Sequence, residues 1–184
     1  MNVYDFDKTI YDGDSTLDFY LYNLKKNPLL IRYIFLQVFA LALYILKIKD
    51  KEYFKEKFYS FLNGIKDIDF EISLFWKKNE KKIKEWYLKQ YKSNDLIISA
   101  SPEFLLSPIS KKLKFKLIAS KVNKKNGNLL GKNCYGREKV FRFNEIYIDK
   151  KIDKFYSDSK SDKYLKEIAK KAFLVNKNDI KEWL

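Results

Sequence analysis

The sequence predicts an α/β fold, a doubly wound parallel sheet with an all-helical insertion directly after its first strand. Short apolar runs with the length of buried parallel strands occur near the start of the chain and again from residue 96 onward. Between them, residues 17–90 carry apolar side chains at helical spacing. With 184 residues, 46% of them hydrophobic, the chain is long enough for one core domain and a modest insertion.

Five apolar runs are the predicted strands, and helical patterns separate several of them, as in βαβ units. They are Val3–Phe6, Leu96–Ile98, Leu117–Ala119, Ile152–Tyr156 and Phe173–Val175. The sequence KNGN near residue 126 predicts a small β-hairpin, because Asn-Gly favours the tight turns of hairpins. We therefore assign residues 1–16 and 91–184 to an α/β core and residues 17–90 to a helical cap.

Start and stop signals divide the insertion into several helices. Asn27 before Pro28, and Asp50 before an apolar stripe, are predicted N-caps, and Gly64 is a predicted stop. The helical spacing then continues from residue 72 to about residue 90. The insertion is thus expected to be helical throughout.

Residues 29–48 form the most apolar stretch. Its uninterrupted part is Val38–Leu46, and Arg32, Gln37 and Lys47 shorten it below the ~20 residues that span a bilayer. We expect a helix packed within the protein, in preference to a helix lying in a membrane surface or a membrane span.

Composition excludes several kinds of chemistry. The chain has no histidine, which excludes imidazole catalysis and histidine metal ligands and leaves proton transfer to carboxylates, Lys or Tyr. Cys134 is the only cysteine, so no intrachain disulfide forms and a reducing compartment is expected. Because the N-terminus has no signal-peptide pattern, we expect a cytoplasmic location.

The formal charge of +14 comes from 38 basic and 24 acidic residues. Only three of the basic residues are arginines, and the lysines are spread along the whole chain. Specific phosphate-backbone recognition favours the planar fork of arginine. A lysine-rich solvated surface is therefore expected, with no nucleic-acid partner.

Four carboxylates follow the first predicted strand within ten positions: Asp5, Asp7, Asp12 and Asp14. In open α/β sheets, ligands bind outside the carboxyl ends of the strands. Two acids spaced as Asp5 and Asp7 allow one to face a substrate while the other exchanges protons beside it. They repel each other unless they share a cation, and Mg²⁺ is the natural candidate because it prefers oxygen ligands. Asp12 is expected to be a turn residue.

Three later segments supply groups that phosphoryl chemistry needs. Ser99 ends a predicted strand just before Ser101-Pro102 begins a helix, so its hydroxyl and the free N–H groups of the helix favour an anion. Lys139 follows Gly136 at a predicted helix start and can place a positive charge against a phosphate. Asp158 and Asp162, four residues apart, allow one carboxylate to bind a metal and the other to support it.

The segments VYDFDKTI, IISASPEFLL, NCYGREKV and FYSDSKSD resemble, in this order, the motifs of the haloacid dehalogenase (HAD) superfamily and of its phosphoserine phosphatase-like branch, subfamily IB. The resemblance covers nearly the whole chain and implies a Rossmann-like sheet with a mobile cap of the C1 type. It implies a nucleophile at Asp5, a general acid/base at Asp7, and a magnesium site of Asp5, Asp7, Asp158 and Asp162. It also implies phosphate or substrate contacts from Ser99, Ala100, Lys139, Asp14 and Thr9, and for Thr9 a role in supporting its loop. In this arrangement Asp7 binds the metal through its backbone carbonyl, and Asp162 supports Asp158.

Some positions depart from the commoner family pattern. Lys8 stands where a small residue is frequent, and Ser157 replaces a glycine. Asp14 stands where phosphoserine phosphatases carry a glutamate that meets the substrate amine, and the cap has only Arg32 to receive a carboxylate. None of these changes removes a reacting group.

The expected function is a magnesium-dependent phosphomonoester phosphatase that acts through an aspartyl-phosphate on a small soluble metabolite. The alternative is a membrane-associated phosphatase of lipid phosphates such as phosphatidylglycerophosphate, because lysines flank the apolar stretch. A non-catalytic polyanion-binding module and a receiver-like signalling domain are less favoured. In a receiver the acceptor Asp follows a middle strand and there is no cap.

Overall fold

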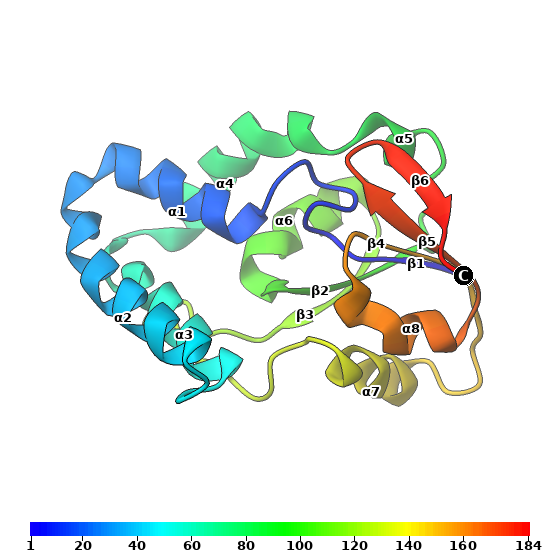
Figure 1. The fold of residues 1–184 in the computed structure, drawn as a ribbon. Coiled ribbons are helices and arrows are strands. Elements are labelled where there is room, and N and C mark those ends of the chain that lie inside the picture. Colours follow the sequence, from blue (N-terminus) through cyan, green and yellow to red (C-terminus); the bar gives the residue numbers. More distant parts are fainter.

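A six-stranded sheet lies at the centre of the computed structural model, which describes residues 1–184 (Figure 1). The strand order is β3-β2-β1-β4-β5-β6, with parallel pairing from β3 to β5 and an antiparallel β6. The strands are β1 (Asn2–Tyr4), β2 (Leu96–Pro102), β3 (Lys116–Ser120), β4 (Ile152–Ser157), β5 (Ala169–Asn176) and β6 (Asp179–Glu182). The five predicted strands and the α/β class are confirmed. The sequence did not indicate β6, whose residues DIKE are almost all charged.

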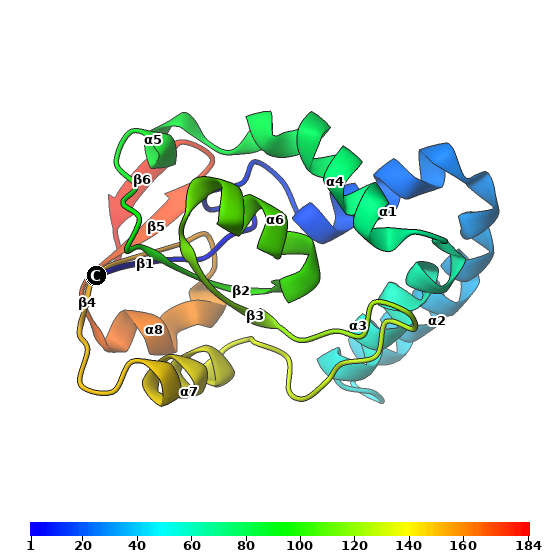
Figure 2. The same cartoon turned by 180° about the vertical axis from the view of Figure 1, so that it is seen from behind.

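Alternate residues of the strands face two helical layers, as a doubly wound sheet requires. Tyr4 and Ile97 pack on one side in the core that includes α6 (Glu103–Leu113). Val3 and Leu96 pack on the other side with α7 (Arg137–Ile146) and α8 (Lys163–Glu167). Figure 2 shows these two helices on the side of the sheet opposite α6. The parallel strands are therefore covered on both faces.

The insertion between β1 and β2 is helical throughout. It consists of α1 (Ser15–Lys26), η1 (Pro28–Tyr33), α2 (Ile34–Ile45), α3 (Lys51–Phe58), η2 (Tyr59–Gly64), α4 (Ile68–Asn79), η3 (Glu80–Lys82) and α5 (Glu85–Leu88), where η denotes a 3-10 helix. The side chains of Asn27 and Asp50 accept hydrogen bonds from backbone N–H groups of the helices that follow them. Both predicted caps are confirmed, and η2 ends at the predicted stop, Gly64.

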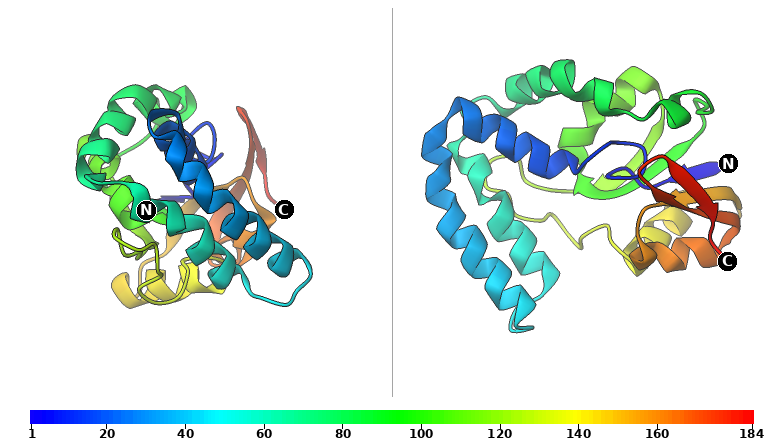
Figure 3. Two further views of the ribbon diagram at one scale, coloured as in Figure 1. Left: turned by 90° about the vertical axis from the view of Figure 1, so that its left-hand side faces the viewer. Right: turned by 45° about the horizontal axis from the view of Figure 1, so that its top comes forward.

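Aromatic side chains fill the interior of the insertion. Phe19, Tyr20, Phe61 and Phe75 are buried in a cluster that also contains residues of the sheet. Trp76 of α4 donates a hydrogen bond from its indole nitrogen to the carbonyl of Leu105 in α6, at 2.6 Å. The later part of the insertion is thus packed on the α/β unit, whereas α2 and α3 lie at the far end of the molecule (Figure 3).

The prediction that residues 29–48 pack within the protein is wrong for most of the stretch. Leu30, Gln37 and Ala40 are its buried residues, whereas Phe35 is 80% exposed. The segment Pro28–Ile45 is long and apolar enough to cross a membrane by length and composition, with a mean hydropathy of 1.9, and 17% of it is buried. Its side chains have no place in the interior because the aromatic cluster fills that space and α2 packs mainly on α3.

The predicted hairpin forms and meets the cap. Val122 and Leu129 form an antiparallel bridge, and Gly127 has a φ of +78° at the turn. A side chain at Gly127 would clash with Tyr59, because its Cβ would lie 2.6 Å from the Tyr59 carbonyl oxygen. The glycine thus serves both the turn and the close approach of the hairpin to the cap.

Hydrogen bonds from helix α3 connect the cap to β2 and to the segment between β3 and α7. The Lys55 ammonium donates to the Ala100 carbonyl at 2.6 Å and to Asn133 Oδ1 at 2.9 Å. Glu56 and Glu52 accept hydrogen bonds from the backbone N–H groups of Leu129 and Asn133. We call these four hydrogen bonds the α3 clasp.

Candidate active site

The predicted site residues meet where β1 lies between β2 and β4, the switch point of the sheet. A cavity of about 400 Å³ opens there between the α/β unit and the cap. Eight of the nine predicted residues line it: Asp5, Asp7, Asp14, Ser99, Ala100, Lys139, Asp158 and Asp162. Leu17, Phe54, Phe58 and Tyr59 of the cap form its apolar wall.

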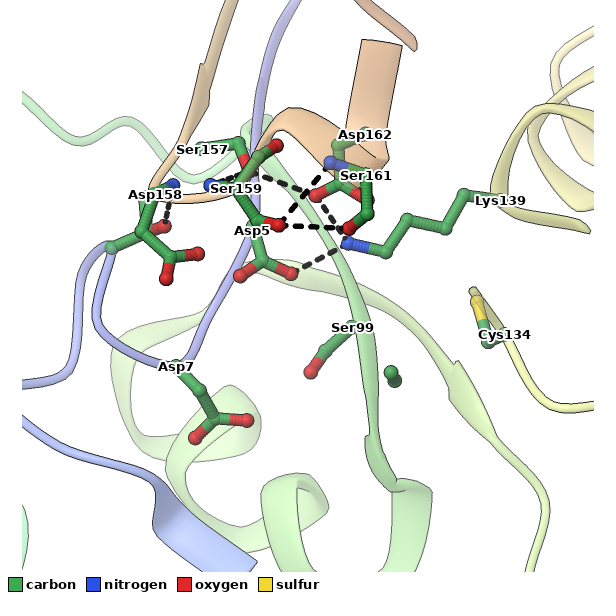
Figure 4. A network of polar contacts seen from close by, with 12 residues as sticks. Asp5, Asp7, Ser99, Cys134, Lys139, Ser157, Asp158, Ser159, Ser161 and Asp162 are labelled. Carbon is green, nitrogen blue, oxygen red and sulfur yellow. Dashed lines mark hydrogen bonds and ion pairs between the residues drawn. The ribbon is translucent and has the colours of Figure 1, made fainter. Parts of the chain in front are cut away.

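Lys139 enters the polar network from the right in Figure 4, where its ammonium contacts Asp5 and Asp162. Its Nζ is 2.6 Å from Asp5 Oδ1 and 2.7 Å from Asp162 Oδ2, and Ser157 Oγ also donates to Asp162 Oδ2 at 2.8 Å. The Lys139 side chain is only 2% exposed. Burial alone would lower the pKa of Lys139, but the carboxylates of Asp5 and Asp162 raise it above its ordinary value. The lysine is therefore a fixed positive charge beside Asp5.

The ammonium of Lys139 does not fully offset the cost of ionising the buried Asp5 carboxyl group. Burial raises the pKa of Asp5 to about 7, Lys139 acts to lower it, and the charges of Asp162 and Asp158 raise it further. Burial, with a contribution from Asp162, also raises the pKa of Asp158. Lys8 and Lys139 act to lower the pKa of Asp158, but they do not offset its burial. The raised pKa values of Asp5 and Asp158 show that the ionised acids lack compensating positive charge, an arrangement that favours an additional cation.

The acidic side chains predicted to bind Mg²⁺ supply some of the oxygen ligands that such an ion needs, but not all of them. Asp162 Oδ1 is buried and has no hydrogen-bond partner, so a polar atom of the cluster is unsatisfied. No three acidic side chains are gathered closely enough to form a complete metal cage. This agrees with a cation that takes one or two carboxylates and completes its shell with water and phosphate oxygens. Asp162 Oδ2 is engaged by Lys139 and Ser157, which supports a position behind Asp158.

Asp7 has a different environment from Asp5. Its Oδ1 accepts from the backbone N–H of Ser15 at 2.6 Å, and its Oδ2 accepts from Ser101 Oγ at 2.5 Å. Burial and the nearby charge of Asp14 raise the pKa of Asp7 to about 6. In Figure 4 its carboxylate points away from Asp5 and Asp158, so the side chain is not placed as a metal ligand. Only its backbone carbonyl remains for that role.

Thr9 supports the loops of the site, as predicted, but the predicted phosphate contact is wrong. It is fully buried and does not line the cavity, so it is not placed to bind phosphate. Its Oγ1 instead accepts a hydrogen bond from the backbone N–H of Asp158 at 2.9 Å and holds the loop after β4 against the loop after β1. Lys8, in the same loop, has a φ of +58°, which explains why a small residue is favourable there.

Asp14 lines the cavity, but its side chain already accepts a hydrogen bond as the N-cap of a helix. Its Oδ1 accepts from the backbone N–H of Leu17 at 2.9 Å and caps α1. Its charge acts on Asp7. Asp12, expected to be a turn residue, lies outside the cavity, where its backbone N–H donates to the carbonyl of Lys82.

Three residues of the site were not assigned a role from the sequence. Ser15 and Ser101 hold the Asp7 carboxylate, and Lys55 enters the cavity from the cap. Partial burial and the neighbouring Lys51 lower the pKa of Lys55 to about 8. For two of them the sequence offered only a position as a signal. Ser101 lies two residues after Ser99, and Lys55 lies beside the apolar stripe of α3.

Replacing Lys139 by methionine is expected to destabilise the protein by about 3–5 kcal/mol at neutral pH, because two buried carboxylates lose their cation. Activity should also be lost. Urea unfolding of Lys139→Met and of Lys154→Met, which changes an exposed lysine, measures the difference. Equal unfolding free energies in the two variants would show that the buried ion pairs do not stabilise the fold.

The comparisons with known proteins agree with this geometry. The family model of the haloacid dehalogenase-like hydrolases matches residues 3–165. No curated protein sequence matches the chain significantly.

Three solved structures share the fold. A protein of unknown function from Bordetella pertussis Tohama I is 17% identical, with a TM-score of 0.72 over 94% of this chain and 87% of that one. A phosphoserine phosphohydrolase-like protein from Francisella tularensis is 17% identical, with a TM-score of 0.56 over 94% and 86%. A HAD family hydrolase from Salmonella enterica serovar Typhi is 11% identical, with a TM-score of 0.58 over 91% and 59%. The superfamily predicted from the four motifs is confirmed, and the chain belongs to the haloacid dehalogenase-like hydrolases.

Proposed function

We propose that the protein is a magnesium-dependent phosphomonoester phosphatase that works through an aspartyl-phosphate on Asp5. The observation that carries the proposal is the contrast between two neighbouring carboxylates. Asp5 is paired with the buried ammonium of Lys139, whereas Asp7 faces away from that cluster and is held by a hydroxyl and an amide. Such a difference in environment suits one acid for attack and the other for proton transfer.

In the first step, Asp5 attacks phosphorus and the bond from phosphorus to the leaving alkoxide breaks. Lys139 holds Oδ1, so Oδ2, which has no protein hydrogen bond, is the attacking atom. Asp7 in its protonated form gives its proton to the leaving oxygen. The products of this step are the free alcohol and a phosphorylated Asp5.

In the second step, Asp7 as a carboxylate takes a proton from water while the water oxygen attacks phosphorus. The bond from phosphorus to Asp5 breaks, which releases phosphate and restores both acids. Ser99 is buried at the cavity wall, and its Oγ accepts from the backbone N–H of Ser101, so its own proton can be donated to a phosphoryl oxygen. Lys139 is fixed close enough to stabilise the charge on the same group.

The residues that would hold the metal are Asp5 and Asp158 through their carboxylates and Asp7 through its backbone carbonyl, with Asp162 behind them. When bound, magnesium would supply positive charge that lowers the pKa of Asp5 and offsets the charge of the incoming phosphate. Asp7 points away from the cluster and can therefore keep its proton while Asp5 is ionised.

Replacing Asp158 by asparagine should raise the magnesium concentration needed for half-maximal activity at least 10-fold to 100-fold, since even supporting residues of metal sites contribute that much. A magnesium titration of turnover measures the shift. Asp179→Asn, at an exposed position in β6, is the matched control. A titration of Asp158→Asn that coincides with that of the control would reject Asp158 as a ligand.

A panel of phosphomonoesters, assayed with magnesium and with a chelator, tests the proposed function directly. Turnover of at least one monoester that disappears with the chelator is the expected result. No turnover of any member, or full turnover without a divalent metal, would contradict the proposal. The expected small soluble substrate depended on the apolar stretch forming the interior of the cap, and that premise does not hold. The cytoplasmic location and the absence of a nucleic-acid partner stay predictions.

A further inference from the structure

An apolar face on the outer side of η1 and α2 has no partner within the protein. Eight of its large side chains are each more than half exposed: Leu29, Ile31, Phe35, Val38, Phe39, Ile45, Leu46 and Ile48. We call this set the α2 face. From Phe35 to Leu46 it follows the spacing i, i+3, i+4, i+10 and i+11, which is the stripe that a helix normally turns toward a core. A contiguous exposed stripe of this kind marks an interaction surface.

The charges around the α2 face select an anionic partner. No acidic residue occurs from Phe19 to Lys49, whereas Lys25, Lys26 and Arg32 precede or enter the stretch. At the tip of the α2–α3 hairpin, Lys47 and Lys49 line a shallow hollow together with Tyr44, Ile48, Asp50 and Tyr53. Apolar side chains bordered by lysines match the interface of an anionic bilayer, where acyl chains lie beneath negative head groups.

The packing of α2 favours a position in the plane of the membrane over a span. Gln37 of α2 donates to the carbonyl of Phe58 at 3.0 Å, and Tyr44 stacks on Phe54 of α3 with ring centroids 5.8 Å apart. The elements on either side, α1 and α3, both line the same cavity through Leu17 and Phe54. A span would place these two helices on opposite sides of a bilayer and take the cavity apart.

The α2 face is also continuous with the cavity. Tyr44 borders the face, and its stacking partner Phe54 belongs to the apolar wall of the site. We propose that the α2 face docks in the plane of an anionic membrane surface and, on the basis of the proposed phosphatase function, that the cavity receives phosphomonoesters anchored in that surface by an apolar chain. The apolar cap wall would contact the part of the substrate next to its phosphate, while Lys51 and Lys55 line the same mouth.

Co-sedimentation with vesicles tests the docking without any turnover. We expect the protein to bind vesicles of phosphatidylcholine with about 30% phosphatidylglycerol in about 0.15 M salt. The double variant Phe35→Asp/Phe39→Asp should bind at least about tenfold more weakly, because it places charge in the apolar interface. Ile146→Asp/Ile148→Asp, which changes two equally exposed side chains near the end of α7, should bind like the unmodified protein. Melting temperatures establish that both variants are folded.

A second variant tests the electrostatic part. Lys47→Gln/Lys49→Gln should weaken binding to the anionic vesicles about tenfold or more and leave the weak binding to pure phosphatidylcholine unchanged. Failure of the unmodified protein to sediment at this salt concentration would overturn the proposal. So would equal binding by the Phe35/Phe39 and Ile146/Ile148 variants.

Analytical ultracentrifugation tests the alternative that the α2 face binds a second copy of the chain. A dimer that the Phe35→Asp/Phe39→Asp variant converts to a monomer, without vesicle binding by either form, would assign the face to a second copy of the chain and overturn membrane docking. The proposed substrate class is tested by comparing the turnover of a long-chain alkyl phosphate in the same vesicles with that of glycerol phosphate. We expect faster turnover of the long-chain ester. Faster turnover of the soluble ester would refute it, whereas no turnover of either, together with vesicle binding, would refute the phosphatase function and leave the docking intact.

Discussion

Replacing Asp5 by asparagine is expected to reduce the turnover of every phosphomonoester to background, a loss on the order of 10⁴-fold or more. An amide does not form the acyl-phosphate, and Asp7, the other acid of the same loop, faces away from the cluster around Lys139. The matched control is Asp12→Asn, seven residues along the chain in a loop position outside the cavity. Activity of Asp5→Asn near that of the control would exclude Asp5 as the nucleophile.

The same variant tests the electrostatics of the site. The folded-state pKa of Asp5, about 7, lies above its ordinary value of 3.8, so its ionised form is disfavoured in the metal-free fold. The contribution of Asp5 to stability is therefore fully present below pH 3.8 and is lost as pH rises through about 7. With chelator present, the melting temperature of Asp5→Asn relative to the unmodified protein should rise between pH 5 and pH 8. A difference that does not vary over this range would contradict the raised pKa.

Replacing Asp7 by asparagine is expected to lower turnover of alkyl phosphates by about 10²-fold to 10⁴-fold, the usual contribution of a general acid/base. The effect should depend on the leaving group. With p-nitrophenyl phosphate, whose leaving group needs little protonation, the first step should persist while the second is slow. A burst of p-nitrophenol in rapid-mixing experiments, equal to the enzyme concentration, measures the trapped phosphoenzyme. An equal loss in both steps, with no burst for this substrate, would contradict the assignment.

A pH profile gives an independent reading of Asp7. Because its pKa is raised to about 6, the protonated form required in the first step is depleted as pH rises above that value. For alkyl phosphates, kcat/KM should therefore fall on the alkaline side, and this limb should be absent from Asp7→Asn. Ser101→Ala, which removes a hydroxyl that stabilises the carboxylate form, should move the limb to higher pH.

The sequence was sufficient for the catalytic half of the molecule because parallel strands impose a simple geometry. Asp5 and Asp158 directly follow β1 and β4, and Ser99 lies within β2. The carboxyl ends of these three strands meet at one edge of the sheet. Lys139 was predicted from a different local signal, because it follows Gly136 at the start of a helix. These positions depend on local order along the chain, which a single sequence displays directly.

The features that sequence reasoning missed depend on what lies opposite a residue in space. The stripe of α2 has the spacing of a core helix, and only the aromatic cluster of Phe19, Phe61 and Phe75 shows that the interior is already filled. Thr9 supports its loop as the motif implies, but only the folded chain shows that its hydroxyl accepts from the Asp158 backbone and does not reach the cavity. Lys55 lies beside an apolar stripe, and nothing in the stripe indicates that its ammonium reaches Ala100.

The α3 clasp has a kinetic consequence. Each of its four hydrogen bonds involves a charged side chain and has a net value of about 1.5–3 kcal/mol, so separating α3 from β2 and from the segment after β3 would cost about 6–12 kcal/mol. At the lower limit of about 6 kcal/mol, roughly one molecule in twenty thousand would be open at any moment. Such a minor population would admit substrate and release phosphate, while the closed majority excludes water during the first step. The rate of opening would then set an upper limit on turnover, whatever the speed of the chemistry at Asp5.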